Sequence, residues 1–197
     1  MAPLKLFTDA SVNPQSKTGY GAYLSIPSGP VHFESLKMCV KVKRFDQTSS
    51  TKLELQTLLW ALTSIQSLNK KVVVYTDSQN IIGLFGRRSR LEFNNYRSKN
   101  NKRIKNYKLY QEFFKIVDQL DCEFEKVRGH KKSHQKDELD KLFTLVDRAS
   151  RRALRHSNVA NYLSIGSKVI VPWALTYIIL FFDFLLKELG QGFLPGS

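Results

Sequence analysis

The sequence predicts one α/β domain built on a mixed five-stranded sheet with helices on both faces, followed by a C-terminal helical extension. Three observations predict this class. Short segments alternate apolar and polar residues, as strands do, whereas longer ones repeat apolar residues every three or four positions, as helices do. The run of Val and Tyr in Lys71 to Thr76 is typical of a strand buried on both faces. Strands and helices also alternate along the chain, which favours crossover connections.

The first half of the domain is expected to start with strands. Leu4 to Thr8 and Tyr20 to Ile26 flank a turn at Asn13 to Thr18, and Val31 to Val42 continues with another strand or two. The spacing of the apolar residues then changes to three and four positions, which predicts a helix over residues 51–68 that packs through one broad face. The apolar residues of that face are Leu53, Leu55, Leu58, Leu59, Leu62 and Ile65.

The second half of the domain follows the Val-rich strand. Asp77 to Phe85 begins a helix, Tyr107 to Leu120 is an amphipathic helix, and Cys122 to Val127 is a strand. A last helix is expected over Asp137 to Arg155. One face of this helix carries Leu139, Leu142, Phe143, Val146, Ala149 and Ala153.

Composition excludes several classes of protein. The chain has 197 residues, of which 42% are hydrophobic and 12% aromatic, so it can bury a core and is neither disordered nor collagen-like. Its net charge of +14 indicates a polyanionic partner, with nucleic acid first and a membrane surface second. Cys39 and Cys122 stand far apart without a CxxC motif, which indicates neither a disulfide scaffold nor a zinc site.

The chain divides by charge into residues 1–157, the predicted α/β domain, and residues 158–197. The second segment has no net charge, and residues 169–186 are almost wholly apolar, about the lower limit for a membrane span. Pro172, Thr176 and Asp183 count against a span. Three roles stay open: a membrane-associated helix, a helix packed on the domain or on another subunit, and an unrelated extension. The N-terminus lacks a secretory signal, so a cytoplasmic location is expected.

Four acidic residues stand where this topology would bring them together. Asp9 directly follows the first strand, and Asp77 directly follows the Val-rich strand. Glu54 lies in the first turns of the long helix, and Asp147 lies on the last helix. Clustered carboxylates repel one another unless cations neutralise them, and oxygen ligands without Cys or His favour Mg²⁺ or Mn²⁺. On a basic chain this predicts two-metal phosphodiester hydrolysis, although Asp77 taken alone is as consistent with a helix cap.

Five motifs resemble those of the type 1 ribonuclease H family and occur in the same order. They are LFTDASVN (6–13), GYGAYL (19–24), LELQTLLWAL (53–62), VYTDSQ (74–79) and VRGH (127–130). The resemblance covers residues 4 to about 156 and implies a ribonuclease H-like fold. It also implies that the chain cuts the RNA strand of RNA/DNA hybrids, leaving 5′-phosphate and 3′-hydroxyl ends.

The resemblance assigns roles to single residues. Asp9 would bridge two Mg²⁺ ions, for which Mn²⁺ can substitute, and Glu54 and Asp77 would complete one of the two sites. His130 matches the family's loop histidine, which assists proton transfer or product departure; its alternative is a solvated loop residue.

The fourth carboxylate has two candidates. Counting ten residues from His130, a common family spacing, reaches Asp140, whereas DRASRRA at 147–153 better matches the family's ligand-bearing helix. Asp147 is preferred because the small residues Ala149 and Ser150 match the family's tightly packed positions.

The expected hybrid contacts fall into two groups. Asn13, Ser50, Thr51 and Gln79 surround the acidic residues, with Ser50 and Thr51 in place of the family's usual asparagine pair. The segment Arg87 to Lys105 carries eight Lys or Arg against a single Glu, with Phe93 and Tyr96 interleaved, and resembles the family's basic protrusion. Its candidates for gripping the DNA strand are Arg97, Lys99, Lys102 and Arg103. The alternative for this segment is a solvated charged face.

Two other classes of function stay open at this point. One is a nucleic-acid binding module without catalysis, but no carboxylate is missing. The other is a nuclease of the same superfold with a different substrate, such as double-stranded RNA or an integrase-like target. A monomer that reads duplex shape rather than base sequence is expected.

Overall fold

The structure is a computed structural model, and it describes residues 3–27, 33–66, 70–127 and 137–157. The chain separates into two units, Met1–Leu154 and Arg155–Ser197. Apart from residues 155–157, the described residues belong to the first unit. The apolar segment 169–186 and His130 lie outside the described residues.

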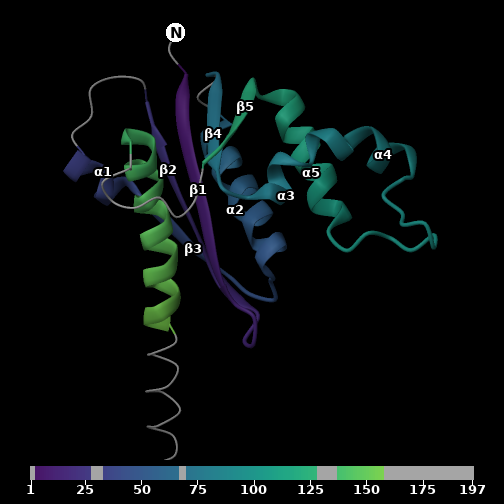
Figure 1. The fold of residues 1–197 in the computed structure, drawn as a ribbon, viewed down its shortest axis with the longest axis horizontal. Helices are drawn as coiled ribbons and strands as arrows, with labels where there is room; N and C mark the ends of the chain where they lie inside the picture. The colour runs from purple at the N-terminus through teal and green to yellow at the C-terminus, as the bar shows by residue number, and fades with distance from the viewer. Residues whose placement is uncertain (1–2, 28–32, 67–69, 128–136, 158–197) are drawn as a thin grey trace, which may run out of the picture. The chain divides into compact units, whose positions relative to one another are not determined.

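A five-stranded mixed sheet forms the centre of the first unit, as the sequence predicts (Figure 1). Its strands are β1 (Leu4–Asn13), β2 (Thr18–Ile26), β3 (Lys41–Phe45), β4 (Val72–Thr76) and β5 (Cys122–Lys126). The order across the sheet is β3-β2-β1-β4-β5. The pairs β1–β2 and β2–β3 are antiparallel, whereas β4 runs parallel to both β1 and β5.

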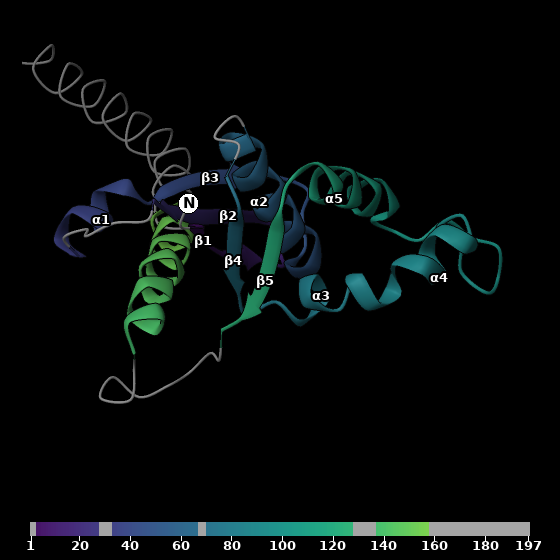
Figure 2. The same cartoon turned by 90° about the horizontal axis from the view of Figure 1, so that it is seen from above.

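Helices cover both faces of the sheet (Figures 1 and 2). The helices of the described residues are α1 (Phe33–Cys39), α2 (Ser50–Ile65), α3 (Gln79–Ile82), α4 (Arg88–Phe93), α5 (Tyr107–Gln119) and a helix over residues 138–157, and of these α4 lies away from the sheet (Figure 2). One core lies between the sheet and helices α2 and α5. A second core joins the opposite face of the sheet to helix 138–157 and to Leu36 of α1.

The strongest sequence patterns are confirmed by burial. Every apolar residue predicted for the packed face of α2 is buried, and all five residues of β4 are buried. Such a strand has no solvated face on which to place polar residues, so it shows no alternation.

The prediction of one or two strands over Val31 to Val42 is wrong for residues 33–39 and holds only at its end, where β3 begins. Phe33–Cys39 is helical, and the strand that follows, β3, starts at Lys41. The helix has only two turns and buries Leu36 alone, so its apolar period is too short to distinguish from strand alternation. Helix Asp77 to Phe85 is also shorter than expected, because α3 spans Gln79–Ile82 and a 3₁₀ turn follows at Phe85–Arg87.

A close approach between α2 and β2 depends on glycine. A Cβ atom added to Gly21 would lie 2.0 Å from Thr57 Oγ1 and 2.9 Å from Thr57 Cβ. Only glycine therefore lets α2 lie this near the sheet, and α2 carries Glu54 one turn before Thr57.

In the parts of the chain that the structure describes, no helix has both the length and the apolar composition needed to cross a membrane.

Candidate active site

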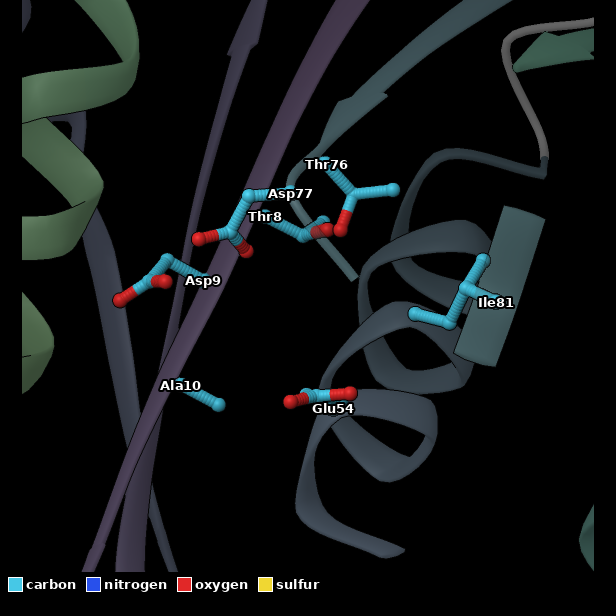
Figure 3. Close-up of a pocket in the computed structure, with 7 residues that line it drawn as sticks. All are labelled: Thr8, Asp9, Ala10, Glu54, Thr76, Asp77 and Ile81. Atoms are coloured by element: carbon cyan, nitrogen blue, oxygen red, sulfur yellow. The ribbon is translucent and has the colours of Figure 1, made fainter. Parts of the chain in front are cut away.

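Asp9 and Asp77 meet where β1 and β4 stop pairing. The parallel register joins Leu4 to Val72 and ends at Phe7 and Tyr75, and continuing the same offset sets Asp9 opposite Asp77. Both carboxylates line one small pocket, and Figure 3 shows them side by side. The sheet is therefore open on the β4 side of β1 at the point where these two acids stand.

Asp9 lies inside β1, which corrects the expectation that it follows the strand. On its other side β1 continues to pair with β2 as far as Asn13, with Asp9 opposite Ala22. The pairing of β1 thus extends further along β2 than along β4. Pairing with β2 therefore holds the backbone at Asp9, whereas the pairing of β1 with β4 has ended two residues earlier, at Phe7.

Glu54 reaches the same pocket from α2 (Figure 3). Ser78 Oγ donates a hydrogen bond to Glu54 Oε2 at 2.5 Å, and Ser50 Oγ lies 3.2 Å from Oε1. Ser78 is the N-cap of α3, since its hydroxyl also accepts from the N–H of Ile81. The capping alternative for Asp77 is therefore wrong, because the next residue has that role.

Burial dominates the electrostatics of Asp9. It raises the pKa of this carboxyl to about 7; a hydrogen bond from Ser150 acts against the rise, and the nearby carboxylates of Asp77 and Asp147 add to it. A positive charge at this point, whether a proton or a metal ion, relieves both the desolvation and the repulsion.

Asp147 and Asp140 have different surroundings on helix 138–157. Asp147 is close enough to Asp9 to affect its pKa, and its Oδ1 pairs with Arg151 Nε at 2.6 Å. Asp140 is buried at the start of the helix, where its Oδ2 accepts the N–H of Asp137 at 3.1 Å. Asp137 Oδ1 in turn accepts the N–H of Asp140 at 2.8 Å. This reciprocal pair is a capping box, so the Asp140 carboxylate serves the helix terminus.

The chemistry of the pocket fits a hard divalent cation. Its charged groups are three carboxylates from β1, α2 and the end of β4, with no sulfur or imidazole among the lining residues. Across the described ranges, no three His, Cys, Asp or Glu side chains converge closely enough to form a ready-made metal site. Serine hydroxyls bond to Glu54, and Arg151 pairs with Asp147.

Asn13, Ser50, Thr51 and Gln79 occupy different positions around the site. Ser50 and Thr51 begin α2, on the same turns as Glu54, and Gln79 is exposed at the start of α3. Asn13 ends β1, where its Oδ1 accepts the N–H groups of Gln15 and Ser16 at 3.0 and 3.3 Å. Asn13 therefore shapes the β1–β2 turn, so its amide oxygen is already engaged.

The four predicted basic residues lie on an exposed loop between α4 and α5. Arg97 and Arg103 face each other across an isolated bridge, and their guanidiniums bond to Asn101 and Asn95. Lys99 and Lys102 are exposed at the tip. The two arginines thus help to fold the loop, whereas the structure gives the two lysines no such bonds.

Other members of the basic segment differ from the expectation. Arg88 pairs with Asp118 and Glu92, and Arg87 bonds to backbone and side-chain oxygens of Asn80. Tyr96 is buried, while Phe93 is 90% exposed. Arg87 and Arg88 are therefore already engaged within the protein.

Two serines contact the acidic residues and were not foreseen from the sequence. They are Ser78, bonded to Glu54, and Ser150, whose Oγ donates to Asp9 Oδ2 at 2.7 Å. The role of Ser78 as a helix cap could have been predicted from the sequence, because a serine before a short apolar run is a common N-cap. Ser150 had only its small size as a signal, because its partner lies 141 residues away.

A family model named RNase H matches residues 1–148. The chain belongs to the RNase H family. Its expected fold is confirmed by this match and by the mixed five-stranded sheet. A curated relative, ribonuclease H from Caldicellulosiruptor saccharolyticus, is 29% identical over 92 residues, which are 45% of this chain and 63% of that protein. The chain thus matches just under two thirds of the length of that relative.

Solved structures show the same fold at low identity. The foamy viral protease-reverse transcriptase in complex with dsDNA superposes with a TM-score of 0.53 and 9% identity, over 75% of this chain and 92% of that one. The native prototype foamy virus protease-reverse transcriptase gives a TM-score of 0.56 and 14% identity, over 76% and 20% of the two chains. At such identities the likeness concerns the fold alone.

Proposed function

We propose that this chain is a metal-dependent endonuclease that hydrolyses the RNA strand of RNA/DNA hybrids. The observation that carries the proposal is the meeting of Asp9, Glu54 and Asp77 in one pocket of an RNase H fold. The ribonuclease H activity named for the relative agrees with it. The charge of +14 adds the attraction that a polyanionic substrate needs.

The carboxylates would hold two Mg²⁺ ions, which Mn²⁺ can replace. Asp9 would be shared, Glu54 and Asp77 would complete one site, and Asp147 the other; its nearness to Asp9 supports Asp147 over Asp140. Metal ions held by these residues would supply activation of the attacking water and stabilisation of the leaving 3′ oxygen, so the cut would leave 5′-phosphate and 3′-hydroxyl ends. The protein's part is to place the acids: β1 and β4 fix Asp9 and Asp77 in register, and α2 sets Glu54 against them.

Substrate binding is proposed to use two regions of the first unit. Ser50, Thr51 and Gln79 lie next to the acids and offer hydroxyl and amide groups to sugar and phosphate. The exposed loop with Lys99 and Lys102 supplies positive charge for the DNA strand. His130 is proposed to assist proton transfer or product departure. Because none of these groups reads a base pair in the major groove, low sequence specificity is expected.

The protein is proposed to act as a cytoplasmic monomer. Membrane association through residues 169–186 is retained only as the open alternative that the apolar composition of that segment suggests.

The test is cleavage of end-labelled duplexes by the full chain. RNA/DNA, RNA/RNA and DNA/DNA duplexes of one sequence are compared in Mg²⁺, in Mn²⁺ and in chelator. The proposal expects internal cuts in the RNA of the hybrid, only with metal present. Binding of the hybrid without cleavage in either metal would favour a binding module, and preferential cutting of RNA/RNA or DNA/DNA would favour a different nuclease of the same superfold.

A further inference from the structure

Ser150 links the two elements that carry Asp9 and Asp147. It is completely buried on helix 138–157. Its Oγ lies 2.7 Å from Asp9 Oδ2, 3.0 Å from Ser11 Oγ and 3.0 Å from the carbonyl oxygen of Asp147. Asp9 and Ser11 both belong to β1, so one hydroxyl connects this strand to the helix beside it.

The protons of this network can be assigned from the contacts. A hydroxyl has one proton to donate, and two acceptors compete for that of Ser150. The Asp9 carboxyl is the nearer acceptor and, when ionised, the charged one, and hydrogen bonds to ionised groups are the stronger ones. Ser11 then donates to Ser150 Oγ, which gives a chain from Ser11 through Ser150 to Asp9.

We propose that Ser150 is a positioning residue for metal binding by Asp9. Its hydrogen bond fixes the rotation of the Asp9 carboxylate, and it sets that carboxylate at a constant distance from the helix of Asp147. Donors that orient a metal-binding side chain commonly change metal affinity by roughly 10- to 100-fold when removed. The inference rests on the proposed function, since it assigns to Asp9 the role of a ligand.

The test measures Mn²⁺ binding to the full chain without nucleic acid, by the loss of free-ion signal in electron paramagnetic resonance. Ser150→Ala is compared with wild type, with Ser11→Ala and with Asp9→Asn. Alanine suits a buried helical position, so the fold is expected to persist. We expect Ser150→Ala to weaken Mn²⁺ binding about 10-fold or more. Ser11→Ala, which leaves the bond to Asp9 in place, should weaken binding much less.

A second measurement separates positioning from simple packing. The melting temperature of each variant is taken without metal, and the Mg²⁺ dependence of hybrid cleavage is then followed. Positioning predicts a higher Mg²⁺ requirement with nearly full turnover at saturating Mg²⁺. A lower melting temperature with unchanged Mn²⁺ affinity, or no change in either, would overturn the inference.

The design also distinguishes the inference from the proposed function. If wild type neither binds Mn²⁺ more tightly than Asp9→Asn nor cleaves the hybrid, the proposed function itself fails. If wild type does both and Ser150→Ala matches it, only the role of Ser150 is wrong.

Discussion

Gly21→Ala tests how closely α2 must lie to the sheet. The added Cβ would lie 2.0, 2.8 and 2.9 Å from Oγ1, Cγ2 and Cβ of Thr57, where ordinary contacts are 3.4–4 Å. Rotating the Thr57 side chain moves the first two atoms but not Cβ, so the helix itself has to retreat. Overpacking of this kind costs about 1–3 kcal/mol.

The expected loss is about 2 kcal/mol in the free energy of unfolding, which for a chain of this size corresponds to about 4–8 °C in melting temperature. Hybrid cleavage should fall as well, because the displaced helix carries Glu54. Gly86→Ala is the matched control, since a Cβ there meets no atom within 4 Å. Urea unfolding and calorimetry measure both variants.

A double variant sharpens the argument. Thr57→Ala removes Oγ1 and Cγ2, and Thr57 Oγ1 is a buried atom without a hydrogen-bond partner, so its loss is inexpensive. Gly21→Ala with Thr57→Ala should therefore be less destabilised than the sum of the single changes. Equal stability of Gly21→Ala and Gly86→Ala would refute the claim that this contact fixes the helix.

Three other predictions concern separate regions. Asp147→Asn should abolish hybrid cleavage. Asp140→Asn should keep cleavage and lower the free energy of unfolding by about 1 kcal/mol, because it weakens the helix cap. The reverse pattern in a cleavage assay would reassign the fourth ligand. Lys99→Gln with Lys102→Gln should weaken the salt dependence of hybrid binding. The slope of log affinity against log salt should become less steep by up to about 1.8, because each lost phosphate contact contributes about 0.9. Lys108→Gln with Lys115→Gln on the exposed side of α5 is the control of equal charge, and an equal change in both pairs would deny the loop a specific role. Burial raises the pKa of the Cys122 thiol to about 11. At pH 8 a thiol reagent should therefore modify the exposed Cys39 rapidly and Cys122 slowly. Fast reaction of Cys122 in the Cys39→Ser variant would contradict the packing of β5.

The elements with long, regular patterns were predictable from the sequence. Helix α2 and strand β4 lie within two or three residues of their expected bounds, because each buries a continuous apolar face. Helix α1 was missed, since seven residues with one buried leucine give no period to detect. Its conformation depends on packing against the sheet, which local sequence does not encode.

The candidate site also has features that the sequence could predict and features that it could not. The acids could be proposed from their places at strand ends and on helices, but the length of β1 beyond Asp9 follows from pairing with β2, a tertiary fact. The capping box of Asp137 and Asp140 was readable in the sequence as two acids three residues apart at a helix start. The bond from Ser150 to Asp9 was not, because nothing local joins residues 141 positions apart.

Whether Asp9 and Asp77 form the catalytic centre is tested by the rate of hybrid cleavage by Asp9→Asn and Asp77→Asn. Each change keeps the shape of the side chain and removes its charge, so folding and hybrid binding should persist. With saturating enzyme and Mg²⁺, single-turnover cleavage of the RNA strand is measured beside hybrid affinity in chelator. We expect affinity close to that of wild type, with cleavage reduced to a few per cent or less. Cleavage near the wild-type rate in either variant would show that the pocket between β1 and β4 is not the catalytic centre.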